Sequence, residues 1–515
     1  MATTLDSHEG SAGDEAFRVE ARGIDYVPET ERWATPRNIG ALWTGSAINI
    51  EYFAYGAILM AFGFKFWTAL SIMIIGNLSF LLLGVASLQG PEAGTTVFTI
   101  NRASFGSQGS RLLSFFNWIT QLGFETEGLI LIVGAIIVLF QMGGVHVSSG
   151  LKVVFIILAA AIQAVMPYLG HATMVKVLRA LIIPFGAIFV VLAVYDFKYG
   201  SASFKGSGYA NGWEIYTAGL AFVFALSGLG WTECGNDYTR YVPRDAKKGA
   251  IVGWIFLGTA IPEIVMMILG ALSYTFLSQS KIAGANLFEA FRGQHFIPSW
   301  IVVLFLLFSI VQLFGINSLD LYSSGVSLQA MGLRLKRYQA VVLDSIIACG
   351  LTLYAVFQST FKEYLTEFVG VIILWIAPWL GVYLVDWIMR RYRYNAAELQ
   401  RTDKGGLYYS GVTGINWSAI IAFFVGMVCA TLAFSKANPP VNFPFHWMTP
   451  ISNHYGSSCA ASLVHGVCTA GWYGGADFSV PTGIIIAGLI YFILESLTGN
   501  VKRQVARQKE LEPIL

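Results

Sequence analysis

The sequence predicts an all-α, multi-pass membrane protein, and its composition and the length of its apolar runs both indicate this fold class. Hydrophobic residues make up 55% of the chain and charged residues only 12%, with a mean hydropathy of +0.62. Soluble domains carry about 25% charged residues. Many apolar runs approach the ~20 residues that an α-helix needs to cross a bilayer. We therefore expect the apolar runs to form transmembrane helices.

Twelve apolar runs are long enough to span a bilayer. In chain order they cover about 39–62, 67–88, 112–140, 153–169, 178–194, 216–236, 250–276, 301–331, 340–357, 365–389, 417–434 and 480–497. The segment before them, residues 1–36, is polar and acidic at its start and has no apolar core. This pattern predicts a tail rather than a cleaved signal peptide.

The distribution of basic residues predicts the orientation. Of the 32 Lys and Arg residues, 24 fall in tails and loops on the side of the N-terminus, and eight fall on the opposite side. Basic residues concentrate in cytoplasmic loops. We therefore expect a plasma- or inner-membrane protein with both termini in the cytoplasm. The loop 436–479 is then external.

The order of the spans predicts two structurally inverted halves. The first comprises helices 1–5 within residues 37–197, and the second comprises helices 6–10 within residues 198–392. Helices 11 and 12, within residues 393–499, follow as a peripheral pair, and residues 500–515 form a cytoplasmic tail.

Two spans contain residues that interrupt helices. Helix 6 runs through Phe222–Arg240, where Ser227, Gly228 and Gly230 are poor helix formers. Helix 1 carries similar polar and small residues within Leu42–Gly56. Irregular backbone at membrane depth is tolerated only where it lines a protein cavity, and paired interruptions in two halves mark the binding site of secondary transporters. We expect both helices to be broken beside a substrate site.

Acidic residues inside the spans are the strongest chemical signal. The set comprises Glu51, Glu125, Glu127, Glu233, Glu263, Asp320, Asp344 and Glu367. A charge at the bilayer centre costs about 2.5–3.5 kcal/mol on insertion scales, so these groups should face a cavity, be paired or be protonated. Glu51, Glu263, Asp344 and Glu367 can equally be structural acids.

Helices 3 and 8 should face each other across the site, and they carry the better candidates. Glu125 and Glu127 lie about 200° apart around helix 3, so only one of them can face the site. We assign Glu127 to the site and Glu125 to a supporting or relay position. With Glu233 and Asp320 they form the set of proton-coupling candidates.

Aromatic and amide residues complete the predicted substrate site. Phe124 and Trp231 could sandwich a flat ring, while Asn49, Asn317 and Asp320 read its polar edge. An apolar body with a few placed polar groups is typical of small-ligand sites. Most other tryptophans are more simply interface or packing residues.

No enzyme, metal or cofactor signature appears. The seven histidines lack metal-ligand spacing, and the glycines near Gly228 follow no strand, so they are not a dinucleotide fingerprint. The net charge of +2 says nothing about nucleic acid, and no nucleic-acid partner is expected. Cys459 and Cys468 share the external loop and could form a disulfide there. The oligomeric state is not predicted.

Three groups of residues form recognisable motifs: Gly23-Ile-Asp-Tyr-Val-Pro28, Gly94-Thr-Thr with Arg102-Ala-Ser-Phe-Gly106, and Asn236-Asp-Tyr-Thr-Arg240. With these motifs the sequence resembles the nucleobase:cation symporter-1 family of purine-cytosine permeases and related carriers. The resemblance implies the five-plus-five inverted-repeat fold of the leucine-transporter type. It also implies cation-coupled uptake of a flat heterocycle by alternating access.

The resemblance also assigns roles to individual residues. Asn49 matches an amide at the helix 1 break, Phe124 a stacking aromatic residue, and Asp320 a substrate-binding amide. Gly128 and Gly228 replace a polar contact and a second stacking residue, which leaves Trp231 for stacking. The family's sodium site corresponds to Gly45, Ile48, Val311, Phe314 and Gly315.

Two of those sodium-site positions lack the family's hydroxyl ligands, because they are Phe314 and Gly315. Together with the intramembrane acids, this favours protons over sodium as the coupling ion. The predicted function is proton-coupled import of a purine or pyrimidine base. The alternatives are sodium coupling, or another heterocycle or amine such as allantoin, hydantoin, vitamin B6 or a thiamine precursor. A channel and a non-transporting sensor are rivals of a different class.

Overall fold

The computed structural model describes residues 15–20, 22–206, 212–283, 287–358, 361–433, 463–464, 467–468 and 476–511. These residues are helical except for connecting segments and one two-stranded antiparallel ribbon, β1 (Leu463–Val464) and β2 (Val467–Cys468). The predicted all-α membrane fold class is therefore confirmed.

The helices follow the predicted order. The first half contains η1 (Glu29–Glu31), α1 (Pro36–Ala47), α2 (Ile50–Ala61), α3 (Phe66–Asn77), α4 (Phe80–Ala86), α5 (Gln89–Ala93), α6 (Val97–Phe105), α7 (Gly109–Met142), α8 (Ser149–Gln163), α9 (Val165–Leu169) and α10 (His171–Tyr199). The second half contains α11 (Trp213–Leu226), α12 (Gly235–Thr239), α13 (Lys248–Tyr274), α14 (Gln279–Ile282), η2 (Leu287–Ala290), α15 (Ser299–Ala330), α16 (Arg337–Gln358) and α17 (Phe361–Met389). The remaining helices are α18 (Ala396–Gln400), α19 (Trp417–Leu432), α21 (Ser479–Thr498) and α22 (Asn500–Leu511).

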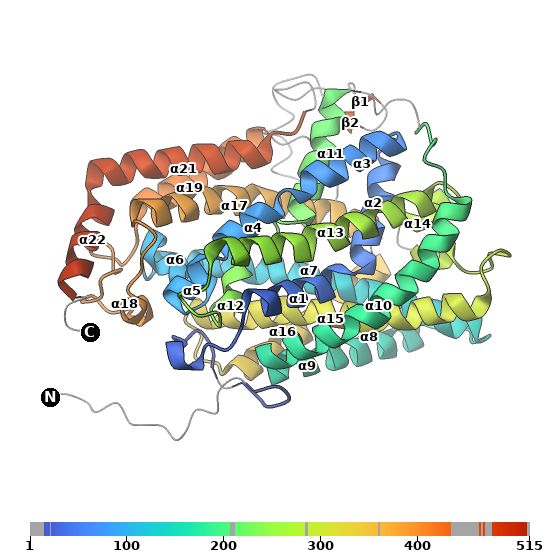
Figure 1. Cartoon of the computed structure of the whole chain (residues 1–515), viewed down its shortest axis with the longest axis horizontal. Helices are drawn as coiled ribbons and strands as arrows, with labels where there is room; N and C mark the ends of the chain where they lie inside the picture. Colours follow the sequence, from blue (N-terminus) through green and yellow to red (C-terminus); the bar gives the residue numbers. More distant parts are fainter. Residues whose placement is uncertain are drawn as a thin grey trace.

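Most helices run along one common direction (Figure 1). Within the described residues, nine helical runs are long and apolar enough to cross a membrane, and three further apolar helices are shorter. The shorter ones, Ile50–Ala61, Ile215–Leu226 and Trp417–Leu432, lie within the first, sixth and eleventh predicted runs.

The first predicted span consists of two helices, α1 and α2, separated by Ile48 and Asn49. Asn49 begins α2 because its side-chain Oδ1 accepts from the backbone N–H of Glu51 at 2.9 Å. Asparagine is a favoured N-cap residue because such a bond satisfies an end-of-helix donor. A local side-chain cap therefore accompanies the interruption.

The sixth predicted span also consists of two helices. The first, α11, ends at Leu226, and a run of turns follows before the short α12 begins at Gly235. The backbone N–H of Gly228 donates to the Ser79 hydroxyl at 2.9 Å, so one freed donor is satisfied from the start of α4.

Close backbone contacts hold the helices around these interruptions. A Cβ at Gly56 of α2 would lie 2.0 Å from the carbonyl oxygen of Met267, and one at Gly270 would lie 1.8 Å from that of Phe53. Small residues allow such approach between membrane helices. These two glycines therefore fix the crossing of α2 and α13.

The outer surface of the bundle is apolar. On α10, Ile183 is 81% exposed and Phe197 is 72% exposed. Exposed large apolar side chains on a helix of this length indicate contact with lipid. The two helices α19 and α21 lie at one edge of the bundle (Figure 1).

The two ends of the bundle differ. The helices α5, α6, α18 and α22 gather at one end, and α14 lies towards the other (Figure 1). The distribution of basic residues predicts that the first end faces the cytoplasm, and we call it the predicted cytoplasmic side. The predicted disulfide is not tested, because Cys459 and most of the loop 436–479 lie outside the described residues.

Candidate functional site

Three buried acids meet where the interrupted first span approaches α7 and α15. Glu51 lies in the first turn of α2, Glu127 in the middle of α7 and Asp320 in the second half of α15. Their exposed fractions are 6%, 0% and 2%. Glu51 lies within electrostatic range of both Glu127 and Asp320. We call these three residues the acid cluster.

The acid cluster is only partly satisfied by hydrogen bonds. Tyr55 donates its hydroxyl to Glu127 Oε1 at 2.6 Å, and Asn49 donates its amide to Glu51 Oε2 at 3.2 Å. Glu127 Oε2 and Asp320 Oδ1 are buried without a partner in the described part of the chain. No described Lys, Arg or His pairs with the cluster. A buried carboxylate without partners is costly, so these oxygens are suited to a proton or an incoming donor.

An aromatic pair adjoins this region. The rings of Phe124 on α7 and Trp231 between α11 and α12 are nearly parallel, with planes 9° apart and centroids 6.2 Å apart. Trp231 Nε1 donates to the Tyr52 hydroxyl at 3.0 Å, which fixes the indole. Phe368 packs edge-on against Phe124 with centroids 4.9 Å apart. The structure thus brings together the two rings that the sequence singled out for stacking.

Three further acids have partners on other helices. Gln163 of α8 donates to Glu125 at 2.6 Å, Gln121 of α7 donates to Glu233 at 3.3 Å, and the Ser227 hydroxyl bonds Glu263. Of the proton-coupling candidates, Glu125 therefore faces α8, on a different side of α7 from Glu127.

Asn317, predicted for the polar edge of the site, bonds two neighbouring helices through its amide nitrogen. Its amide donates to the Glu125 carbonyl at 3.1 Å and to Gln163 Oε1 at 3.0 Å. The amide thereby joins α15 to α7 and α8. A Cβ at Gly128 would lie 2.0 Å from Asn317 Oδ1, so the two residues mark a close helix contact. Asn317 Oδ1 is buried without a partner in the described residues, so it can still accept from an incoming donor.

Gly228, which the resemblance places at a substrate contact, packs against the start of α4 on its Cβ side. A Cβ there would lie 2.2 Å from the Phe80 nitrogen and from the Ser79 carbonyl carbon. Because backbone fills the space on this side, the glycine allows the turn after α11 to pack on α4. Nothing larger fits at this position.

The other polar residues of this segment bind backbone groups at the predicted cytoplasmic side. Asn236 Oδ1 accepts from the Gly90 N–H at 2.7 Å, and Asp237 Oδ1 accepts from the Val97 N–H at 3.0 Å. They hold α12 against the α5–α6 connection and do not line the acid cluster.

Gln312 of α15 occupies the interruption of the first span. Its Nε2 donates to the carbonyl of Ile48, and its Oε1 accepts from the N–H of Ile50 at 3.1 Å. Both backbone groups are freed where α1 ends and α2 begins, so one side chain satisfies the break from both sides.

The remaining positions of the predicted sodium site lie nearby. A Cβ at Gly45 would lie 2.6 Å from the carbonyl oxygen of Leu178, and one at Gly315 would lie 2.8 Å from its side chain. Leu178 of α10 thus packs between the two glycines. Phe314 is partly buried, and the Val311 side chain is 47% exposed on the outer face of α15.

Sequence reasoning did not single out Tyr52, Tyr55 and Gln312. The signal for the tyrosines was their spacing of three residues on the apolar helix after Asn49, which places them on one face. Gln312 offered no such signal, because its partners Ile48 and Ile50 lie more than 260 residues away in the chain.

Comparisons with known proteins agree on one family. A sequence profile described as "Permease for cytosine/purines, uracil, thiamine, allantoin" matches residues 26–456. YxlA of Bacillus subtilis, which carries a purine-cytosine permease name, is 24% identical over 97% of this chain and 100% of its own length. The purine-cytosine permease FCY21 of Saccharomyces cerevisiae is 23% identical over 80% of this chain and 79% of its own length.

A solved structure shares the fold. The transporter Mhp1 of the nucleobase-cation-symport-1 family, in a closed conformation with bromovinylhydantoin bound, superposes with a TM-score of 0.70. The alignment covers 94% of this chain and 96% of Mhp1 at 17% identity. At this identity the similarity shows the fold alone.

Proposed function

The chain belongs to the family of permeases for cytosine and purines, uracil, thiamine and allantoin, and we propose that it imports a purine or pyrimidine base coupled to protons. In this proposal the carrier lies in the plasma or inner membrane with both termini in the cytoplasm. It alternates between outward- and inward-facing states.

The observation that carries the proposal is the parallel pair of Phe124 and Trp231 near a partly unsatisfied acid cluster. A flat ring between them needs carbon contacts of about 3.5 Å on each face, hence a spacing of about 7 Å. The centroids are 6.2 Å apart, and the spacing between the two ring planes is no larger than this, so one ring must move outward to admit a base.

The acid cluster would read the polar edge of the base. A carboxylate only accepts hydrogen bonds, whereas a protonated carboxyl group donates one. Asp320 Oδ1 and Glu127 Oε2 have no partner in the described residues, so each can accept an N–H of the cargo or carry a proton. In the proposed cycle, protonation of Glu127 or Asp320 removes charge from the site and allows it to close around the base.

Gln312 supports protons over sodium as the coupling ion. A sodium ion at the helix 1 break would need the Ile48 carbonyl, and that carbonyl already accepts from the Gln312 amide. Leu178 further fills the space between Gly45 and Gly315. A side-chain donor thus takes the place that a cation would need.

The alternative keeps the fold and changes the cargo or the ion. Three acids near the aromatic pair would suit a cationic or donor-rich heterocycle, such as an amine or a thiamine precursor, as well as they suit a base. Sodium coupling would require Gln312 to turn away from Ile48.

The test is a thermal-shift panel on purified protein followed by uptake into proteoliposomes. We expect adenine, guanine or cytosine to raise the melting temperature more than allantoin, hydantoin, pyridoxine or thiamine precursors, without need of sodium. A pH gradient, inside alkaline, should drive accumulation that a protonophore abolishes.

Stabilisation by other ligands alone would support the alternative cargo. Uptake that never exceeds the external concentration would indicate a channel, and binding without flux would indicate a sensor.

A further inference from the structure

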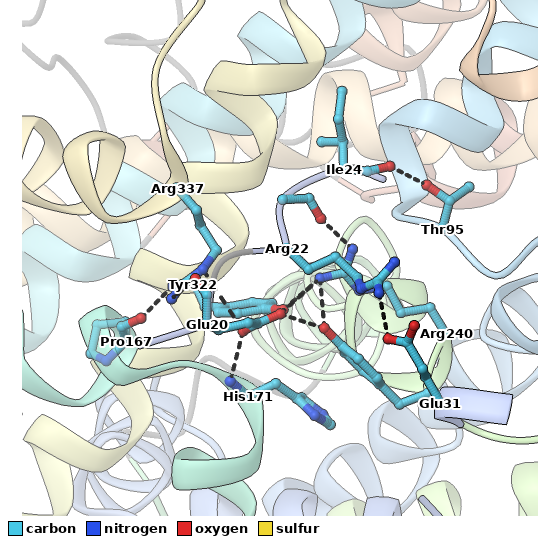
Figure 2. A network of polar contacts seen from close by, with 12 residues as sticks. Glu20, Arg22, Ile24, Glu31, Thr95, Pro167, His171, Arg240, Tyr322 and Arg337 are labelled. Atoms are coloured by element: carbon cyan, nitrogen blue, oxygen red, sulfur yellow. Dashed lines mark hydrogen bonds and ion pairs between the residues drawn. The ribbon is translucent and has the colours of Figure 1, made fainter. Parts of the chain in front are cut away.

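A single acid of the N-terminal segment is buried at the predicted cytoplasmic side. Glu20 is 5% exposed and lies between the guanidinium groups of Arg240 and Arg337 (Figure 2). Its Oε1 lies 3.3 Å from Arg240 Nη2, and its Oε2 lies 3.7 Å from Arg337 Nε. Neither arginine is more than 1% exposed. One carboxylate thus faces two buried cations.

Neutral donors complete the shell of Glu20. The hydroxyl of Tyr322 donates to Oε1 at 3.0 Å, and the hydroxyl of Tyr241 also donates to Oε1. The backbone N–H of His171 donates to Oε2 at 3.0 Å. We call this set the Glu20 network: Glu20, His171, Arg240, Tyr241, Tyr322 and Arg337.

The Glu20 network ties together elements from both predicted halves. His171 begins α10 in the first half. Arg240 directly follows α12, Tyr322 lies in α15 and Arg337 begins α16, all in the second half. Because α12 directly follows the turns that carry Trp231, the network is connected to the aromatic pair through one short helix.

Backbone hydrogen bonds and close packing fix the position of Glu20. Its N–H donates to the Leu169 carbonyl at 3.1 Å, and its own carbonyl accepts from Arg337 Nη2 at 3.2 Å. A Cβ at Gly170 would lie 2.4 Å from Glu20 Cβ, and Gly170 has a φ of +107°. Only glycine suits both the conformation and the space there.

One edge of the segment is accessible to water. Beyond Glu20, a groove of about 550 Å³ lies between Ala16, Trp33 and α10, and Lys176 and Arg179 of α10 line it. Phe17 is 57% exposed and is held by its N–H bond to the Thr173 hydroxyl at 2.8 Å. Water therefore reaches the segment on the side of Ala16 and Phe17.

We propose that Glu20 is the residue that keeps the predicted cytoplasmic side closed, and that its contacts with Arg240 and Arg337 must break before cargo can leave. The proposal rests on the proposed transport by alternating access. A path for cargo at this side requires neighbouring helices to separate here, and the Glu20 network joins α10, α12, α15 and α16 at this side. Without Glu20, two arginines share a buried site with no acid between them, so their repulsion and their need for water favour opening.

The first experiment reads the conformation without using transport. Cys234 directly precedes α12 and is fully buried, so its labelling from the predicted cytoplasmic side reports opening of the contacts around that helix. The other four cysteines are replaced by serine. Inside-out membrane vesicles are then treated with a membrane-impermeant maleimide. We expect Glu20→Gln to label Cys234 about tenfold faster or more, since loss of one partner from a buried ion pair is strongly destabilising.

Glu15→Gln is the matched control, because Glu15 is an exposed acid of the same segment and pairs only with Arg18 in the described contacts. It should label like the parent protein. Equal labelling of the Glu20 and Glu15 variants would overturn the proposal. Complete labelling in detergent-denatured samples and the melting temperature identify a variant that fails to fold.

The second experiment works even if Glu20→Gln does not fold. A Cβ at Gly23 would lie 2.1 Å from Gln329 Oε1, at the end of that side chain on α15, so cysteines at these two positions can be joined by a short bis-methanethiosulfonate reagent that reduction removes. In a background without native cysteines, the cross-linked protein should lose uptake, keep binding of the cargo, and regain uptake on reduction. Uptake at the uncross-linked rate would show that the segment need not detach.

The two experiments separate this inference from the proposed function. Faster Cys234 labelling in Glu20→Gln, in a protein that transports no nucleobase, would keep Glu20 as the closing residue and reject the cargo. Nucleobase transport with unchanged labelling and an inert cross-link would keep the cargo and reject Glu20.

Discussion

The side-chain amide of Gln312 on α15 donates to the backbone carbonyl of Ile48, at the point where the first span is interrupted. The same amide accepts from Ile50 at 3.1 Å, so it bridges α1 and α2. Backbone groups freed inside a membrane must find partners within the protein. Here the partner is a neutral side chain, and no ion is needed to satisfy the break.

Removing this amide should therefore destabilise the protein. We expect Gln312→Ala to lose about 1–3 kcal/mol, because the Ile48 carbonyl and the Ile50 N–H would be left buried and unsatisfied. Melting temperatures in detergent measure the effect. Gln279→Ala, which removes an exposed glutamine at the start of the short α14, is the control and should melt like the parent. Equal melting temperatures of the two variants would mean that Gln312 does not stabilise the break.

Glu127→Gln should separate binding from accumulation. The glutamine keeps the size of the side chain and can still bond Tyr55, so cargo binding should change by only a few-fold. It cannot take up or release a proton, so accumulation driven by a pH gradient should disappear. Binding is followed by thermal shift and accumulation by uptake into proteoliposomes.

An acid outside the membrane provides the control for this variant. Hydrogen bonds from Arg401 lower the pKa of the exposed Asp403 to about 2, so this carboxylate stays charged throughout the assay range. Asp403→Asn should leave the pH dependence of uptake unchanged. Undiminished accumulation in Glu127→Gln would remove Glu127 from the coupling mechanism.

Local sequence patterns were sufficient for the fold class and for much of the acid cluster. Long apolar runs predict membrane helices because the bilayer fixes their length, and acids within those runs stand out because lipid penalises charge. Helical geometry alone separates Glu125 from Glu127, and the structure gives them partners on different helices, Gln163 and Tyr55.

What the sequence could not show were contacts between distant segments. Gly228 is a poor helix former in any sequence, but the backbone of Ser79 and Phe80 that it packs against lies about 150 residues earlier. Asn317 suited the polar edge of a site, yet its amide is directed to Gln163 of α8. Such pairings depend on which helices become neighbours, and periodicity within one helix carries no information about that.

The aromatic pair should contribute directly to affinity. Base–aromatic stacking is worth about 1–3 kcal/mol on alanine substitution, so Phe124→Ala should weaken nucleobase binding about tenfold or more. Phe115→Ala removes a ring of the same helix that is 42% exposed on the outer surface, and it should leave affinity unchanged. Competition binding with a radiolabelled base measures both. Equal affinities would place the base elsewhere than between Phe124 and Trp231.

Gly228 offers the sharpest test of the turn between α11 and α12. A methyl group there would lie 2.2 Å from the Phe80 nitrogen and the Ser79 carbonyl carbon, and backbone atoms cannot turn aside as a flexible side chain could. Overpacking of this kind costs about 1–3 kcal/mol or more, so Gly228→Ala should lower the melting temperature and the yield of folded protein. Gly253→Ala is the matched control, because Gly253 lies inside α13 with nothing within 4 Å of a new Cβ. Alanine is a better helix former than glycine by about 1 kcal/mol, so this control should be as stable as the parent or more so. A Gly228→Ala protein that melts like the Gly253→Ala protein would mean that the turn does not pack on α4 as described.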